Sequence, residues 1–330
     1  MDYRFLGNTG LRISEYAFGT MSFGGDADEK TARELFHICR DAGVNTFDCA
    51  NVYNDGRAEE ILGALISDCR EEVIITSKVY FPTGEDVNAR GSTRKHIRSE
   101  IEKSLRRLNT EYIDIYFLHR FDARTPMENT LRVLDDLVRQ GKILYPAASN
   151  FAAWQVEKAL GISAREGLAH LEVIQPMYNL VKRQAEVEIF PMAATENLGV
   201  LPYSPLGGGL LTGKYSREEK PETGRLTENE MYQIRYGDEW IYRTAEKFTE
   251  FAAEQGFSPV SLALAWVAGH PAVTAPLMGA RNPEQLREAL GAVKINMTPE
   301  LRAEISALSP TPPPATDRNE ERTEVTFGKR

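Results

Sequence analysis

Eight apolar segments of strand length recur through this sequence, and they constrain its fold more than any other feature. Most are rich in β-branched or aromatic residues and lack polar–apolar alternation, which is typical of strands buried on both faces. In chain order they span residues 15–20, 43–48, 72–78, 112–119, 142–150, 171–175, 199–203 and 272–279.

Helical patterns separate these strands. The alternation of eight strands with helices predicts an α/β fold in which a parallel sheet closes into a (β/α)8 barrel, or TIM barrel. A doubly wound open sheet is the alternative, but no GxGxxG motif follows the first strand.

Several helix starts can be read from capping residues. Apolar residues three or four apart predict a helix that starts near Thr93 and another that ends at Gly141. The second should open with Thr125 as N-cap, Pro126 at the first helical position and Glu128 completing a capping box. Three more helices are expected to begin at Ser258-Pro259, Asn282-Pro283 and Thr298-Pro299.

We expect a single barrel domain over residues 1–309. The stretch 214–238 is too long and polar for an ordinary loop between a strand and a helix, so it is predicted to be a lid-like insertion. Residues 310–330 should form a separate tail, because four prolines between 310 and 314 cannot continue the barrel.

Charge and composition argue against several partners. The net charge of −9 comes without a basic stripe, so no nucleic acid is expected. No apolar run approaches the length of a membrane span, and the polar segment after Met1 does not resemble a signal peptide. Three cysteines without a CxxC pair indicate free thiols and a cytoplasmic location.

In such a barrel, functional residues lie at the carboxyl ends of the strands. Taken singly, a lysine or histidine there is more often solvated or structural than catalytic. Lys78 is the exception, because an ammonium at the end of a buried run needs a partner, and Asp48 is within reach. The strand ends in order are Thr20, Asp48, Lys78, His119, Ser149, Asn150, Gln175, Tyr203 and Gly279.

Tyr53 lies five residues past Asp48 in the same loop. A free phenol, with a pKa of about 10, is too weak an acid to protonate a substrate efficiently at neutral pH. The ammonium of Lys78 is expected to lower the pKa of Tyr53, while Asp48 positions Lys78. With His119 nearby, the group indicates a site that delivers a proton to a substrate oxygen.

The remaining strand ends suggest a ligand that contains an amide and an aromatic ring. Ser149, Asn150 and Gln175 offer the donors and acceptors that a carboxamide needs. Tyr203 offers a face on which a flat heterocycle can stack. A nicotinamide fits this description.

The combined motifs resemble those of the aldo-keto reductase family, in the branch that contains bacterial reductases and the β subunits of voltage-gated potassium channels. The resemblance covers roughly residues 3–309. It implies reduction of an aldehyde or ketone to the alcohol, with hydride from NADPH and the proton from Tyr53, and no metal. The motifs are FDCANVYNDGRAEEILG, TSKV, LHRFD, SNF, QPMYN, YSPLGGGLLTGKY and MGARNPEQLREAL.

The resemblance also assigns individual residues. It implies a catalytic tetrad of Asp48, Tyr53, Lys78 and His119. It implies that NADP(H) contacts Thr20, Met21, Ser149, Asn150, Gln175, Tyr203, Ser204, Pro205, Leu206, Gly207, Gly208, Lys214, Gly279, Arg281, Gln285 and Glu288.

The segment GGLLTGKY, residues 208–215, nearly matches the ATP-binding motif G-x-x-x-x-G-K-[ST]. Tyr215 stands where that motif needs a hydroxyl for magnesium. The resemblance instead implies a loop that covers the pyrophosphate of a dinucleotide without a metal. Ala289 departs from the family pattern, because many relatives have Asn there near the adenine.

Two other functions stay open. One is a cofactor-sensing regulatory subunit with weak or no turnover, although His119 stands where the channel β subunits typically carry Asn. The other is a metal-dependent hydrolase using Asp48, His119 and Asp122, for which the first strand lacks an HxH motif. Whatever the function, an apolar substrate pocket could be walled by Met21, Phe23, Tyr80, Phe81 and Phe121.

Overall fold

The computed structural model describes residues 1–216 and 224–325. Eight parallel strands form one sheet in the order β10-β3-β4-β5-β6-β7-β8-β9, and each overlaps one of the eight predicted segments. They are β3 (Ala17–Gly19), β4 (Thr46–Asp48), β5 (Ile74–Val79), β6 (Ile113–Leu118), β7 (Ile143–Ser149), β8 (Val173–Gln175), β9 (Gly199–Val200) and β10 (Leu277–Met278).

Backbone hydrogen bonds bring the two edge strands of this sheet together. The amides of Thr274 and Ala275 donate to the carbonyl oxygen of Val200, and the amide of Leu277 donates to that of Pro202. These bonds join the chain around β9 to the chain around β10. The predicted (β/α)8 barrel is therefore confirmed.

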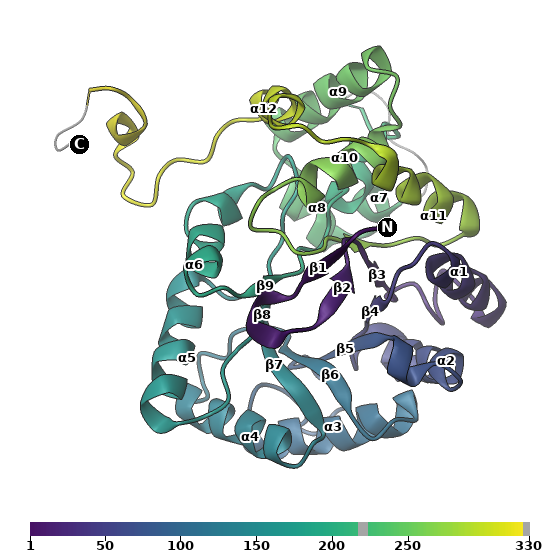
Figure 1. The fold of residues 1–330 in the computed structure, drawn as a ribbon, viewed down its shortest axis with the longest axis vertical. Helices are drawn as coiled ribbons and strands as arrows, with labels where there is room; N and C mark the ends of the chain where they lie inside the picture. Colours follow the sequence, from purple (N-terminus) through teal and green to yellow (C-terminus); the bar gives the residue numbers. More distant parts are fainter. Residues whose placement is uncertain (217–223, 326–330) are drawn as a thin grey trace.

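Helices surround the barrel (Figure 1). Each of α1 to α6 packs against the next, and α11 packs against both α10 and α1. These helices are α1 (Glu29–Asp41), α2 (Arg57–Ile66), α3 (Arg94–Leu108), α4 (Met127–Arg139), α5 (Ala153–Glu166), α6 (Ile189–Thr195), α10 (Pro259–Ala268) and α11 (Pro283–Leu290). The described chain also forms α7 (Arg225–Glu228), α8 (Glu230–Tyr236), α9 (Glu239–Glu254) and α12 (Pro299–Ala307).

Most of the predicted helix starts are confirmed. Ser258, Asn282 and Thr298 each accept a backbone N–H at the start of α10, α11 and α12, and a proline follows each of them. The start of α4 was predicted wrongly. Pro126 is its N-cap, and the hydroxyl of Thr125 donates to Asp122 instead of capping the helix.

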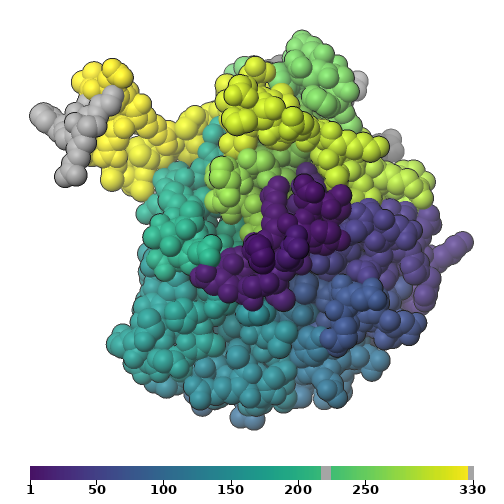
Figure 2. Space-filling model, in the orientation of Figure 1, coloured from purple at the N-terminus to yellow at the C-terminus, as the bar shows by residue number. Residues whose placement is uncertain are grey.

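A hairpin that the sequence analysis did not predict closes the amino-terminal end of the barrel. It pairs β1 (Tyr3–Phe5) with β2 (Arg12–Ser14) and lies across the middle of the ring of helices (Figures 1 and 2). The side chains of Leu6 and Ile13, which belong to this hairpin segment, are fully buried in the barrel interior. They form one apolar cluster with Ala17, Ile115, Phe117, Ala147, Val173, Leu201, Ala275 and Leu277.

Two peripheral segments complete the chain. Residues 217–223 of the expected insertion 214–238 lie outside the described residues, and the part after them contains α7 and α8. The tail after residue 310 projects from the body in Figure 2, and its last five residues, 326–330, are outside the described part. None of the described helices is long and apolar enough to cross a membrane.

Candidate active site

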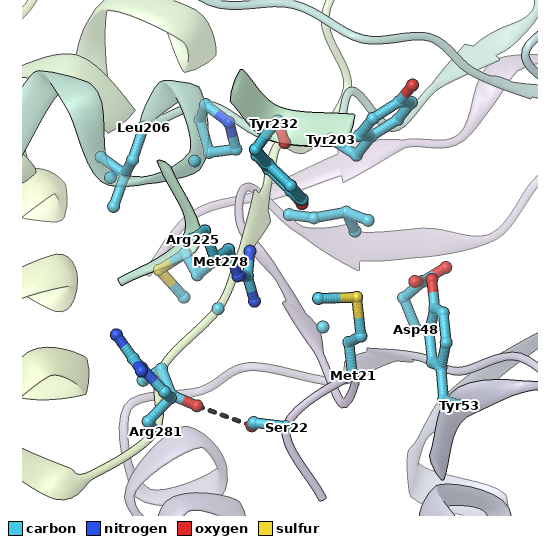
Figure 3. A pocket seen from close by; sticks show the side chains of 18 of the residues that line it. Met21, Ser22, Asp48, Tyr53, Tyr203, Leu206, Arg225, Tyr232, Met278 and Arg281 are labelled. Atoms are coloured by element: carbon cyan, nitrogen blue, oxygen red, sulfur yellow. Dashed lines mark hydrogen bonds between the residues drawn. The ribbon is translucent and has the colours of Figure 1, made fainter. Parts of the chain in front are cut away.

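A cavity of about 990 Å³ opens at the carboxyl ends of the strands (Figure 3). Thr20, Lys78 and Gly207 do not line it, although the sequence placed them in the site. The predicted site residues that do line it are Met21, Asp48, Tyr53, His119, Ser149, Asn150, Gln175, Tyr203, Ser204, Pro205, Leu206, Gly208, Lys214, Gly279, Arg281, Gln285 and Glu288.

The floor of the cavity is a chain of hydrogen bonds from Asp48 through Lys78 to Tyr53. The fully buried ammonium of Lys78 lies 2.6 Å from Oδ2 of Asp48 and 3.2 Å from the phenol oxygen of Tyr53. Its third contact, at 2.8 Å, is the backbone oxygen of Cys49. All three N–H donors of Lys78 are therefore used, and the phenol oxygen accepts one of them. The hydroxyl proton of Tyr53 is left available for a group in the cavity.

Asp48 is held by two further donors. Its Oδ1 accepts from the hydroxyl of Thr76 at 2.7 Å and from the side-chain amide of Gln175 at 2.8 Å. Gln175, which was expected to contact the cofactor, thus also supports Asp48. The carboxylate is only 1% exposed, so these bonds and the ion pair to Lys78 keep a buried charge satisfied.

Lys78 lowers the pKa of Tyr53 as expected, but the net pKa is raised because burial has the larger effect. Burial raises the pKa of Tyr53 to about 12, and Lys78 acts in the predicted direction without overcoming it. The charge of Lys78 can be read from the sequence, but the extent to which the fold buries the phenol of Tyr53 away from water cannot. Burial disfavours the charged form of Lys78 and lowers its pKa. The negative charge of Asp48, and then Tyr53, outweigh this effect and raise the pKa of Lys78 above its usual value. Lys78 therefore remains an ammonium.

His119 borders the same end of the cavity as a neutral imidazole. Burial, assisted by the positive charge of Lys78, lowers the pKa of His119 to about 3. Its ring packs edge-on against Tyr53 at 6.1 Å between centroids and against Phe81 at 4.8 Å. A neutral imidazole here can donate or accept one hydrogen bond but is not a proton source at neutral pH.

Left-handed backbone follows Tyr53 and fixes the position of its loop. Asn54, Asp55 and Gly56 have φ values of 49°, 56° and 90°. The side-chain amide of Asn54 donates to the backbone oxygens of Met21 and Phe23, at 3.0 and 2.7 Å. Asn and Asp tolerate this conformation better than other non-glycine residues. The loop after β4 is thereby tied to the loop after β3.

The carboxamide-binding candidates form a connected set at the ends of β7 and β8. Asn150 donates to the backbone oxygen of His119 at 2.9 Å, and its Oδ1 accepts from the hydroxyl of Tyr203 at 2.6 Å. The hydroxyl of Ser149 donates to the backbone oxygen of Gln175. These contacts hold an aromatic ring and several polar groups beside Tyr53.

The other end of the cavity is basic. Arg225 and Arg281 lie there, away from Tyr53 and Asp48 (Figure 3). Burial lowers the pKa of Lys214, and the positive charges of Arg281 and Arg225 lower it further, so the three cations are close together. Like charges at this separation are stabilised when an anion binds among them.

Close packing shapes the loop at this end. Gly208 has φ of 71°, and a Cβ there would lie 2.7 Å from the ring of Tyr232 on α8. Only glycine therefore lets the loop after β9 approach this helix. The guanidinium carbons of Arg225 and Arg235 lie 5.7 and 5.1 Å from the centre of the same ring.

Three candidates for the adenosine end already have partners. Arg281 forms an ion pair with Asp26 at 3.6 Å, with both side chains partly exposed. Its backbone amide donates to the side chain of Gln285 at 3.0 Å. Glu288 accepts from the hydroxyl of Ser258 at 2.7 Å.

Several lining residues were not predicted. Arg225, Met231, Tyr232 and Arg235 come from the insertion, where a polar sequence gave no periodic signal. Arg120 belongs to the motif LHRFD, but no signal in the sequence separates it from a solvated arginine. The full set of unpredicted residues includes Gly19, Ser22, Val52, Gly209, Thr212, Val260, Leu264, Leu277, Met278 and Ala280.

The apolar wall is confirmed in part. Met21 and Phe81 line the cavity, whereas Tyr80 and Phe121 do not. Phe23 is fully buried in the core.

Among the described residues, no group of three or more His, Cys, Asp or Glu side chains could hold a metal ion.

Comparisons with known proteins place the chain among related sequences. A sequence profile described as Aldo/keto reductase family matches residues 15–310. An uncharacterized oxidoreductase, YrpG of Bacillus subtilis, is 36% identical over 94% of this chain and 97% of its own length. A probable voltage-gated potassium channel subunit beta of Oryza sativa is also 36% identical, over 96% of this chain and 99% of its own length. A protein with the same description from Arabidopsis thaliana is 35% identical over 89% and 92%.

Proposed function

Because the chain belongs to the aldo/keto reductase family, an oxidoreductase family that generally uses NAD(P)H, we propose that it reduces an aldehyde or ketone to the alcohol, with NADPH as the preferred cofactor. The observation that carries this proposal is the hydrogen-bonded chain from Asp48 through Lys78 to Tyr53 at the floor of a large cavity.

The residues of the cavity fit a dinucleotide. Polar groups and the Tyr203 ring lie at the end near Tyr53, where a nicotinamide would find carboxamide partners and an aromatic face. The cations Lys214, Arg225 and Arg281 lie at the other end, where phosphates would pair with them. NAD(P)H bound in this way supplies a hydride to the carbonyl carbon.

Tyr53 supplies the proton in this proposal. Its O–H donates to the carbonyl oxygen while its own oxygen accepts from Lys78. As the carbon takes the hydride, the oxygen gains charge and takes the Tyr53 proton, leaving a phenolate. The ammonium of Lys78 stabilises this phenolate by its charge and by its hydrogen bond. Neutral His119 orients the carbonyl with one hydrogen bond.

The test is Tyr53→Phe, which removes the donor and preserves the ring. Turnover of 4-nitrobenzaldehyde or methylglyoxal, followed by NADPH absorbance, should fall by about a hundred- to ten-thousandfold, since proton transfer contributes roughly 10²–10⁴-fold. NADPH binding, measured by quenching of protein fluorescence, should stay nearly unchanged. Wild-type turnover in this variant would exclude Tyr53 as the proton donor.

A regulatory subunit is the second candidate, favoured by the descriptions of the rice and Arabidopsis relatives. The same assay on the unaltered chain separates the two. NADPH binding without turnover of any aldehyde would favour the regulatory function, and steady turnover would favour the reductase.

A further inference from the structure

The cavity is basic, although the chain as a whole has a net charge of −9. Among the residues that the structure describes, two carboxylates line it, and both are engaged: Asp48 pairs with Lys78, and Glu288 accepts from Ser258. The basic side chains that line it are Arg120, Lys214, Arg225, Arg235 and Arg281. This excess of positive charge is set up to receive more than one anionic group.

The basic side chains divide into two sets. Lys214, Arg225 and Arg281 act on one another, and the proposed function assigns them to the phosphates of the dinucleotide. Arg120 directly follows His119 in the loop after β6. Arg235 lies on α8 and is close to Tyr203: burial raises the pKa of Tyr203, and the positive charge of Arg235 partly offsets that rise. Arg120 therefore belongs to the end of the cavity where Tyr53 lies, whereas Arg235 lies near Tyr203 and on the same Tyr232 ring as Arg225.

Neither guanidinium of the second set has an acidic partner in the described part of the chain. The guanidinium of Arg235 packs over the ring of Tyr232. The carboxylate nearest to Arg120 in sequence, Asp122, already accepts from the backbone amides of Ser92 and Arg124 and from the hydroxyl of Thr125. An anion in the cavity would be the natural partner of both arginines.

We propose that the preferred substrate carries, besides its aldehyde or ketone, an anionic group that Arg120 and Arg235 bind. A carboxylate or a phosphate fits, because both match the fork of donors on a guanidinium. Met21, Phe81 and Met231 line the cavity as well and suit an apolar spacer between the two groups. This inference rests on the proposed reductase function.

The experiment compares two benzaldehydes with planar para substituents of similar size. One, 4-carboxybenzaldehyde, is anionic, and the other, 4-nitrobenzaldehyde, is neutral. The value of kcat/KM is measured for each with saturating NADPH, in the unaltered chain and in Arg120→Gln and Arg235→Gln. The ratio of the two values is compared between variants, so the intrinsic reactivities of the two aldehydes cancel.

The ratio of anionic to neutral kcat/KM should fall about ten- to a hundredfold in Arg120→Gln, mainly through KM, because charged hydrogen bonds are lost. Arg235→Gln should lower it in the same direction. The matched control is Arg124→Gln: Arg124 is exposed in the same loop and does not line the cavity. Its ratio should equal that of the unaltered chain.

A third aldehyde, 4-formylphenyl phosphate, distinguishes carboxylate from phosphate. The anion that the arginines prefer should give the larger ratio of anionic to neutral kcat/KM in the unaltered chain and the larger fall of that ratio in Arg120→Gln. An unchanged ratio in both arginine variants would overturn the inference and leave the reductase function standing. A ratio that falls equally in Arg124→Gln would overturn it too, because a general surface charge would then be responsible. No turnover of any aldehyde by the unaltered chain would instead remove the proposed function.

Discussion

Single residues show what a sequence can reveal about this site. Lys78 was paired with Asp48 because an ammonium at the end of a buried strand needs a carboxylate, and the 2.6 Å contact confirms that pairing. The effect of Lys78 on the pKa of Tyr53 has the predicted direction, but the net pKa is raised by burial, which many distant side chains create together. The bond from Gln175 to Asp48 joins residues 127 positions apart, a register that no local pattern encodes.

At this scale, Lys78→Met should lose most of its activity. Without the ammonium, the phenolate of Tyr53 loses its stabilising charge and Asp48 is left buried without its ion partner. Breaking a buried pair in this way should also cost about 3–5 kcal/mol in the free energy of unfolding, measured by urea denaturation. The residual rate should rise only at lower pH, and an unchanged pH–rate profile would remove Lys78 from the mechanism.

Arg281→Ala should weaken NADPH binding by about ten- to a hundredfold, since charged hydrogen bonds are worth roughly 1.5–3 kcal/mol. NADH, which lacks the ribose phosphate, should be affected far less. Dissociation constants from fluorescence titration at two salt concentrations test this, because the gap should shrink as salt rises.

The ion pair to Asp26 provides the matched control for Arg281. Asp26→Asn frees the guanidinium from an exposed partner that contributes about 0–1 kcal/mol, so NADPH binding should tighten by up to roughly fivefold. Equal losses for NADPH and NADH in Arg281→Ala would place the side chain against the adenine or the fold instead.

At the scale of elements, the barrel strands were predictable and the hairpin was not. Strands buried on both faces read as apolar runs, so all eight segments stood out. The β1–β2 hairpin has three-residue strands and an exposed Phe5, and only Leu6 and Ile13 mark its buried side. The helices α7 and α8 follow a polar stretch, which the sequence indicated only as an insertion.

Leu6→Ala should lower the free energy of unfolding by about 2–5 kcal/mol, because it leaves a hole in a fully buried cluster that the barrel strands enclose. Phe5→Ala is the control, since its side chain is 67% exposed on the same hairpin and should change stability by no more than about 0.5 kcal/mol. Urea denaturation of the three proteins measures both. Equal losses would mean that the hairpin is held by its outer face.

At the scale of the whole molecule, histidines that the fold keeps neutral couple stability to pH. Burial lowers the pKa of His270 to about 4, and its ring packs against Phe190 and Tyr178. His119 is shifted in the same direction. In the unfolded chain both would titrate near pH 6.5. Below that pH the unfolded state binds more protons, so the stabilisation is full above pH 6.5 and is lost as the pH falls.

Between pH 7 and pH 5 each of these histidines should therefore cost about 1–2 kcal/mol in the free energy of unfolding. His270→Gln should remove its own contribution and flatten the dependence on pH, whatever its effect at pH 7. Urea denaturation at several pH values gives the slope directly. A slope unchanged by His270→Gln would mean that this ring is already charged in the folded protein.

The hairpin across the amino-terminal end has a consequence for access to the cavity. Leu6 and Ile13 fill the barrel interior at its amino-terminal end. In the described structure, ligands therefore enter and leave by the carboxyl-terminal rim, where the cavity opens. If the proposed cofactor and substrate both bind in the cavity, they enter and leave by this same rim. The side from which both would be released is in that case set by a hairpin of two three-residue strands at the opposite end of the barrel.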